Sequence, residues 1–243
     1  SVTKYSESTA ICRLFGRKHG MISGAVRGAM SCKHKGNYQV GNSFQAEWSA
    51  RLAEHLGSLK CEVTSSVAAY FLNDNVRLTA LNSLMVLTQN TLAEHDPHPQ
   101  LYDALHALLE KMKQNDESWL ADYARYELLL LGESGFRLEL ERCVVTGETE
   151  NLAYVSPKSG SAVTAETGEP YKDKLLKLPD FLKSHSTVHT LQSMCDALTL
   201  TGYFLEHRLF ASHSKPIPPA RTRFTNKINK LLQSSVEAAK EVA

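Results

Sequence analysis

The chain has 243 residues, of which 42% are hydrophobic and 22% charged, and its formal net charge is +1. This composition is that of a folded globular protein, and it excludes a disordered or collagen-like chain. No apolar run approaches the roughly 20 residues that cross a bilayer, and the first residues lack a signal-peptide pattern, so we expect an intracellular protein without a membrane segment.

Charge is distributed in blocks along the chain. Residues 1–60 hold nine Lys or Arg against three Asp or Glu, whereas residues 92–170 hold six against fifteen. Residues 207–243 are basic again, with seven against two. Such blocks favour contact of both ends of the chain with a polyanion, although surface charge often serves only solvation.

The first 74 residues have the pattern of short strands. Apolar and polar residues alternate in part, and glycine stands inside or beside the strands, where it marks a bend or a close backbone approach. A small, strongly curved β-barrel is therefore predicted. The expected strands are TAICRLFG (9–16), MISGAVRGA (21–29), NSFQAEWSA (42–50) and LGSLKCEVTSSVAAY (56–70).

From about residue 75 the period becomes helical. The segment HDPHP (95–99) separates the first two helices because proline blocks helix continuation. Short strands and turns are expected at 136–170, inside the otherwise helical part. The predicted helices are 76–94, 99–113, a third from about Ser118 to Gly132 or Gly135, a fourth from about 187 to 210, and a last one carrying Phe224, Ile228, Leu231 and Leu232 on one side.

The stretch RKHGMISGAVRGAMSCKHKG (17–36) is basic and rich in glycine, and no carboxylate occurs between Glu7 and Glu47. Unpaired cations neutralise phosphates readily, because they only have to release a counterion. Curved barrels also suit single-stranded nucleic acid, although few aromatic residues are available here for base stacking. A solvated basic hairpin is the alternative interpretation. The candidate contacts are Arg13, Arg17, Lys18, Arg27, Lys33 and Lys35, with His19 and His34 when protonated.

Patterns typical of catalysis or metal binding are missing from the sequence. Neither a phosphate loop nor a dinucleotide-binding glycine motif occurs, and there is no Gly-x-Ser-x-Gly elbow. His185 and His189 stand four residues apart, but a zinc site needs three or four ligands. The five cysteines are odd in number and contain no Cys-x-x-Cys pair, so reduced thiols are expected. We predict no enzyme activity, no cofactor and no metal.

Three segments together resemble the bacterial DNA repair and recombination mediator family RecO. They are FGRKHGMISGAVRGAMSCKHKGNYQVGNSFQAEWSARLAEHLGSLKCEV, GFRLELERCVVTGETENLAYVSPKSGSAV, and LTLTGYFLEHRLF followed by KPIPPAR. The resemblance implies an oligonucleotide-binding barrel, the OB-fold, followed by a helical domain. It also implies binding of single- and double-stranded DNA, strand annealing, and cooperation with RecR and the single-stranded-DNA-binding protein in loading recombinase.

The central segment departs from the family pattern. Many members hold a four-cysteine zinc site there, but here Thr146 follows Cys143 where a second ligand would stand. Because structural zinc asks for four ligands, a zinc-finger-like β segment without its zinc is expected. The family's contact with the acidic tail of the single-stranded-DNA-binding protein suggests that Arg125 or Arg137 receives this tail.

The sequence thus predicts an α+β protein with an OB-fold barrel at 1–74 and a helical domain at 75–243, which carries a β-rich insert at about 136–170. The expected function is that of a DNA-binding recombination mediator in the cytoplasm, associated with the nucleoid. A protein-interaction adaptor is the alternative, and a nuclease is weaker because acidic metal ligands are missing from 8–46. Further DNA contacts are expected from the last helix through Arg221, Arg223, Lys227 and Lys230.

Overall fold

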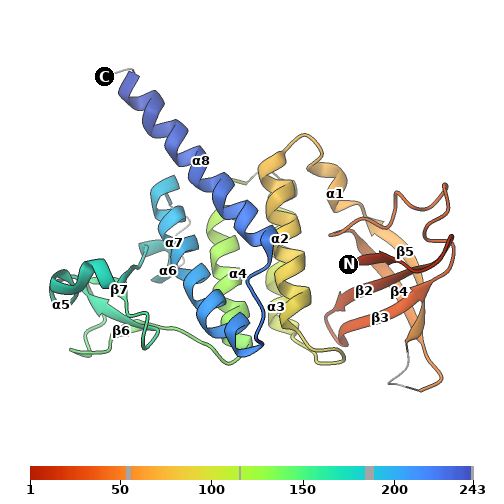
Figure 1. Cartoon of the computed structure of the whole chain (residues 1–243), viewed down its shortest axis with the longest axis horizontal. Coiled ribbons are helices and arrows are strands. Elements are labelled where there is room, and N and C mark those ends of the chain that lie inside the picture. Colours follow the sequence, from red (N-terminus) through yellow and green to blue (C-terminus); the bar gives the residue numbers. More distant parts are fainter. Residues whose placement is uncertain (53–55, 115, 184–188, 242–243) are drawn as a thin grey trace. The chain divides into compact units, whose positions relative to one another are not determined.

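The computed structural model describes residues 1–52, 56–114, 116–183 and 189–241. Residue contacts group the chain into two compact units, an amino-terminal unit (Ser1–Gln114) and a carboxyl-terminal unit (Asn115–Ala243). Both contain strands and helices, so the protein is α+β as predicted (Figure 1). These units are defined by contacts and need not coincide with folding domains. The domain boundary expected near residue 74 therefore stays a prediction.

The amino-terminal unit contains a five-stranded sheet in the order β1-β2-β3-β5-β4. All neighbours are antiparallel except β3 and β5, which are parallel. This Greek-key order, in which the last strand inserts beside the third, is the one expected for an OB-fold. In the described residues no strand pair closes the sheet between its two edges. The strands are β1 (Val2–Lys4), β2 (Ala10–Gly16), β3 (Gly20–Val26), β4 (Ser43–Ser49) and β5 (Gly57–Ser65).

Glycines mark the place where β3 pairs with β5, since Gly24 and Gly57 lie opposite each other. A Cβ on Gly24 would lie 2.7 Å from Cγ of Leu59, and one on Gly57 would lie 2.1 Å from the indole nitrogen of Trp48. That nitrogen instead donates a 3.0 Å hydrogen bond to the Ser23 carbonyl. The close approach predicted from glycine inside a strand is therefore confirmed where these two strands pair.

Three helices follow the sheet in the amino-terminal unit: α1 (Val67–Tyr70), α2 (Asn75–Thr91) and α3 (Pro99–Lys113). The carboxylate of Asp74 caps α2 by accepting hydrogen bonds from the backbone N–H groups of Val76 and Arg77. The predicted strand 56–70 was too long, since β5 ends at Ser65 and a helical turn begins at Val67. Val67 and Phe71 are buried there, so tertiary packing overrides the local strand preference.

The carboxyl-terminal unit combines helices with a second sheet of order β6-β8-β7-β9. The sheet begins in the predicted insert and extends to Lys177. The elements are α4 (Trp119–Glu133), β6 (Glu139–Cys143), β7 (Leu152–Val155), β8 (Ser161–Thr164), α5 (Ala165–Gly168), the 3-10 helix η1 (Glu169–Lys174), β9 (Leu176–Lys177), α6 (Asp180–Lys183), α7 (Leu191–Phe204), the π-helix η2 (Leu205–Phe210) and α8 (Pro219–Glu241).

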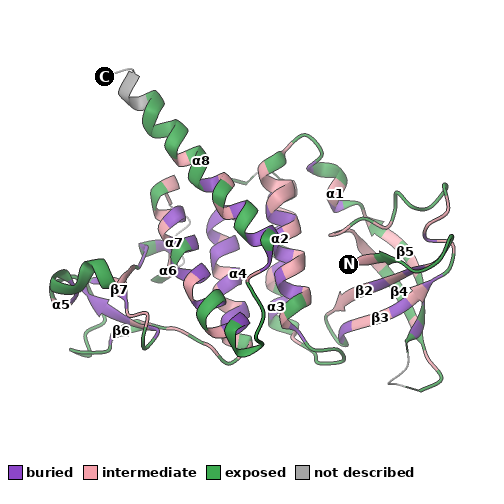
Figure 2. Cartoon of the chain, viewed as in Figure 1, coloured by how far each residue is buried: buried purple, intermediate pink, exposed green. Residues whose placement is uncertain are grey.

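The core of this unit lies where α4, α7 and α8 pack together (Figure 2). The ring of Phe224 lies 4.4 Å from that of Tyr123 and 6.2 Å from that of Trp119, centroid to centroid. Phe224 and Ile228 are fully buried, whereas Leu231 is 40% exposed, so the apolar face predicted for α8 is covered only in its first half. No helix in the described part of the chain is long and apolar enough to span a bilayer.

Candidate nucleic-acid interface

Residues 27–42, here called the basic loop, connect β3 to β4 through successive turns. Gly28, the second residue of the loop, has φ of +78°, a conformation that glycine adopts without strain. The Ser31 carbonyl accepts hydrogen bonds from the N–H groups of His34 and Lys35, at 3.0 and 2.9 Å. Buried Ala29 joins the loop to the core of the sheet. The sequence therefore gives this segment a defined backbone from which its side chains project.

The cations of the basic loop are solvent-exposed. Arg27, Lys33, His34 and Lys35 are all exposed, as is Lys18 in the β2–β3 hairpin. Across the described ranges of the chain none of these five side chains takes part in an ion pair. They match the arrangement expected from the sequence, in which cations do not have to leave a carboxylate before meeting a phosphate.

Arg13 and Arg17 differ from this expectation, because the chain supplies partners that are distant in sequence. The guanidinium of Arg17 donates to both carboxylate oxygens of Asp103 on α3, at 2.8 and 3.0 Å. Arg13 donates to the carbonyls of Gln89 and Leu92, at 3.0 and 3.2 Å. The inference that both arginines lack partners was wrong, since the absence of nearby acids in the sequence says nothing about helices some 80 residues later.

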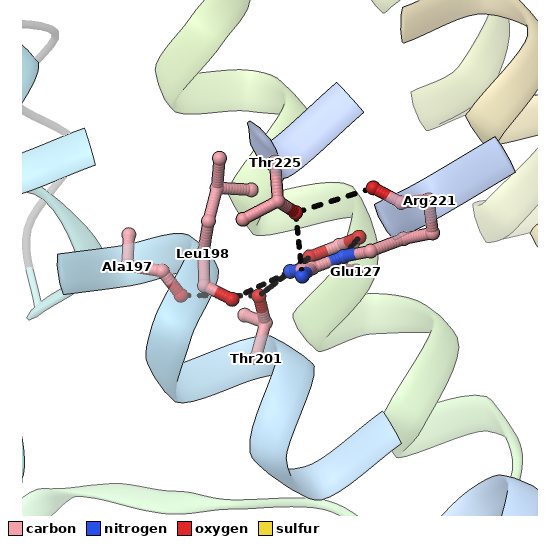
Figure 3. A network of polar contacts seen from close by, with 6 residues as sticks. All are labelled: Glu127, Ala197, Leu198, Thr201, Arg221 and Thr225. Atoms are coloured by element: carbon pink, nitrogen blue, oxygen red, sulfur yellow. Dashed lines mark hydrogen bonds and ion pairs between the residues drawn. The ribbon is translucent and has the colours of Figure 1, made fainter. Parts of the chain in front are cut away.

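Arg221 is in the interior of the carboxyl-terminal unit (Figure 3). Its guanidinium donates to both oxygens of Glu127 at 3.0 Å, to the Leu198 carbonyl at 2.6 Å and to the Thr225 hydroxyl at 2.8 Å. Burial disfavours the charged guanidinium, but the Glu127 carboxylate outweighs it and keeps the pKa of Arg221 above its ordinary value. With all three guanidinium nitrogens hydrogen-bonded and 5% of its surface exposed, Arg221 does not fit the predicted role of contacting DNA.

The burial of Arg221 could have been predicted from helical spacing in the sequence. Arg221, Phe224 and Ile228 stand at positions i, i+3 and i+7, which share one helix face. Because the two apolar members are buried, the arginine beside them is buried as well. Arg223 and Lys230 lie elsewhere around α8 and are exposed, and Lys227 is half-buried.

The two arginines predicted to receive a partner's tail have different surroundings. Arg125 on α4 donates to the Asp122 carboxylate at 2.9 Å and to the Phe181 carbonyl at 2.8 Å. It thereby ties α4 to α6, which gives it a structural role in addition to any binding role. Arg137 is exposed. Binding of an acidic tail by either residue stays a prediction.

Cys143, which the sequence comparison singled out as a lone thiol without further zinc ligands, ends β6, and its side chain is buried. Burial raises the pKa of this thiol, but hydrogen bonds from the Thr146 hydroxyl and from the backbone N–H groups of Thr146, Thr164 and Val145 outweigh it and lower the pKa to about 7. The Thr146 hydroxyl also lies 3.1 Å from the Glu148 carboxylate, so its one proton has two acceptors. A network of hydrogen bonds thus surrounds the sulfur.

Metal binding was not expected from the sequence. Apart from residues outside the described ranges, no three His, Cys, Asp or Glu side chains come together as a possible metal site. His185, considered with His189 as a ligand pair, lies outside the described residues. The absence of a metal stays a prediction.

Replacing Thr146 by valine should raise the pKa of Cys143 above about 7, because the hydroxyl donor is lost while the backbone donors remain. The Cβ chemical shift of ¹³C-labelled cysteine, followed against pH, reports this titration directly. Since the folded pKa lies below the ordinary thiol value of 9.0, ionisation stabilises the fold fully above about pH 9, and the contribution is lost as pH falls through about 7. A titration midpoint unchanged in the valine variant would contradict the role of the hydroxyl.

The fold defines the class to which the chain belongs: an α+β protein with a five-stranded Greek-key sheet of OB-fold order and a carboxyl-terminal unit built on helices and a small sheet. Comparison with known families specifies the class further. Residues 1–67 match the family model described as Recombination protein O N terminal, and residues 72–216 match Recombination protein O C terminal.

Curated relatives match the chain over nearly its whole length. A DNA repair protein RecO from Rhodospirillum centenum is 41% identical over 232 residues, which are 95% of this chain and 92% of the relative. Relatives of the same name from Granulibacter bethesdensis and Rickettsia typhi are 37% and 40% identical, covering 98% and 93% of this chain and 96% and 93% of their own lengths. The chain belongs to the RecO family of bacterial DNA repair proteins, and its amino-terminal sheet is the OB-fold of that family.

Proposed function

We propose that this RecO-family protein binds single- and double-stranded DNA through its amino-terminal unit, anneals complementary strands, and helps to load recombinase in recombinational repair. The observation that carries the proposal is the basic loop. It presents Arg27, Lys33, His34 and Lys35 to solvent without ion-pair partners in the described residues, beside an OB-fold sheet. Folds of this kind bind oligonucleotides.

Annealing follows from charge neutralisation. Each strand is a polyanion, and cations that replace its counterions reduce the repulsion between two strands brought together. Phosphate contacts carry no sequence information and leave the base edges unoccupied, so the bases can pair while the backbone is bound. This role requires no bond-making by the protein and no cofactor. It places the protein in the cytoplasm, associated with the nucleoid.

Partner proteins complete the proposed role. They are RecR and the acidic tail of the single-stranded-DNA-binding protein, with Arg125 or Arg137 as the residue that receives the tail. The exposed cations of α8, Arg223 and Lys230, together with half-buried Lys227, are proposed as further DNA contacts.

Binding of a labelled single-stranded oligonucleotide should weaken steeply with salt. For single strands, the slope of log affinity against log salt concentration is about −0.7 per phosphate neutralised. We expect a slope of about −3 if Lys18 and the Arg and Lys side chains of the basic loop all contribute. Fluorescence anisotropy at several salt concentrations measures it. Binding that is absent, or that does not change with salt, would contradict the proposal.

An interaction adaptor remains the second candidate, and one observation favours it. Val144 and Val145 are 54% and 67% exposed in the turn after β6, within the acidic part of the sequence. Two neighbouring exposed valines offer a partner protein a small apolar contact, although only larger contiguous patches mark such sites in general. A salt-insensitive interaction with RecR, together with no DNA binding, would support this alternative.

A further inference from the structure

The ion pair between Arg17 and Asp103 connects the end of β2 with α3. It lies beside an aromatic contact, in which Phe15 packs edge-on against Tyr102 at 5.6 Å between ring centroids. Arg17 lies two residues beyond Phe15, and Asp103 directly follows Tyr102. The aromatic contact and the ion pair thus join the same two segments within the amino-terminal unit.

The geometry of the pair is that of an arginine holding an oxyanion. Nε and Nη2 of Arg17 each donate to a separate oxygen of Asp103, at 2.8 and 3.0 Å. A guanidinium makes the same two-point contact with a phosphate. Hydrogen bonds from Arg17 also hold the pKa of the Asp103 carboxyl below its ordinary value, so the carboxylate is charged at neutral pH.

The pair is also open to exchange. The side chains of Arg17 and Asp103 are 55% and 54% exposed, and ion pairs as exposed as this one contribute little to stability. Arg13 provides the contrast, because its side chain is 24% exposed and its guanidinium is bonded to two main-chain carbonyls. Arg17 can leave its partner at little cost, whereas Arg13 cannot.

We propose that Asp103 occupies the phosphate position on Arg17 and competes there with DNA, so that it limits the affinity of the amino-terminal unit for single strands. Lys18, the next residue, is exposed and has no ion pair among the described residues. A DNA strand with one phosphate bound at Lys18 would bring a neighbouring phosphate to Arg17. That second phosphate would displace the Asp103 carboxylate from the guanidinium. The inference rests on the proposed function, since it assigns a regulating residue to the DNA-binding amino-terminal unit.

Asp103→Asn tests the competition, because it removes the charge and keeps the size of the side chain. We expect affinity for a labelled single strand to rise several-fold at about 0.1 M salt, and the salt slope to steepen by about 0.7, as one more phosphate contact becomes available. Glu62→Gln serves as the matched control. Glu62 is an exposed carboxylate of the same unit with no ion pair in the described part of the chain.

Arg17→Gln completes a double-mutant cycle. In this background Asp103→Asn should have no more effect than the Glu62→Gln control. Equal increases in affinity with and without Arg17, or an unchanged salt slope, would overturn the inference in favour of a general charge effect or a merely structural pair. If the wild type itself shows no salt-dependent DNA binding, the proposed function fails. If it binds normally and Asp103→Asn changes nothing, only this inference fails.

Discussion

Replacing Arg221 by methionine is expected to lower the free energy of unfolding of the carboxyl-terminal unit by about 3–5 kcal/mol. The substitution leaves the Glu127 carboxylate, which is fully buried, without its guanidinium partner. An unpaired charge in the interior is far more costly than the removal of one surface interaction. The Leu198 carbonyl, which accepts a 2.6 Å hydrogen bond from Arg221, also loses that donor.

Urea denaturation of the full chain measures this decrease, with Arg223→Met as the matched control. Arg223 is an exposed arginine of the same helix, so its replacement should change stability by no more than about 0.5 kcal/mol. Combining Arg221→Met with Glu127→Leu removes both charges and should recover part of the stability, because an apolar pair of similar volume tolerates burial. If Arg221→Met and its control Arg223→Met are equally stable, the buried pair does not support the fold.

Gly202 shows how closely the rest of the unit is fitted to this pair. A Cβ at this position would lie 2.7 Å from Nη1 of Arg221. Glycine on α7 therefore leaves the room that the guanidinium occupies between α7 and α4. Glycine is less favourable than alanine inside a helix. Here the missing side chain lets the Arg221 guanidinium come close enough to α7 to donate to the Leu198 carbonyl (Figure 3).

Local patterns in the sequence predicted most of the elements. Helices α2, α3 and α4 begin and end within a few residues of the predicted bounds, because capping residues, proline and apolar spacing act within one or two turns. The turn at Val67 was missed, since the preceding strand pattern continues through it and only burial against other elements decides. Periodicity indicates which face of an element is apolar, but not what covers that face.

Interactions between distant residues account for the errors in the candidate site. Arg17 and Asp103 are 86 residues apart, and Arg221 and Glu127 are 94 apart. Counting charges within a short segment of the sequence does not detect such long-range pairs. The same count indicated the basic loop, whose turns present its cations outward. Sequence charge thus marked which segments are basic, whereas the structure separates arginines held by carboxylates from those left to solvent.

Only cations without partners in the protein are free to bind phosphate, so the variant that best locates the DNA-binding site replaces the exposed cations of the basic loop. Replacing Arg27, Lys33 and Lys35 of the basic loop by alanine should flatten the salt slope for a single strand by about 2, that is about 0.7 for each phosphate that is no longer neutralised. By the same relation, affinity at about 0.1 M salt should fall on the order of 100-fold. The side chains are exposed, so the melting temperature of the variant should stay close to that of the wild type.

A matched variant distinguishes a local site from a decrease in overall charge. Replacing Lys158, Lys174 and Lys215 by alanine removes three exposed cations of the carboxyl-terminal unit and changes the net charge by the same amount. Anisotropy titrations should show a slope close to that of the wild type for this variant and a flattened one for the basic-loop variant. If both slopes flatten equally, the protein attracts DNA through its general field. If neither does, the basic loop is a solvated surface, and the phosphate contacts have to be sought on Arg223, Lys227 and Lys230 of α8.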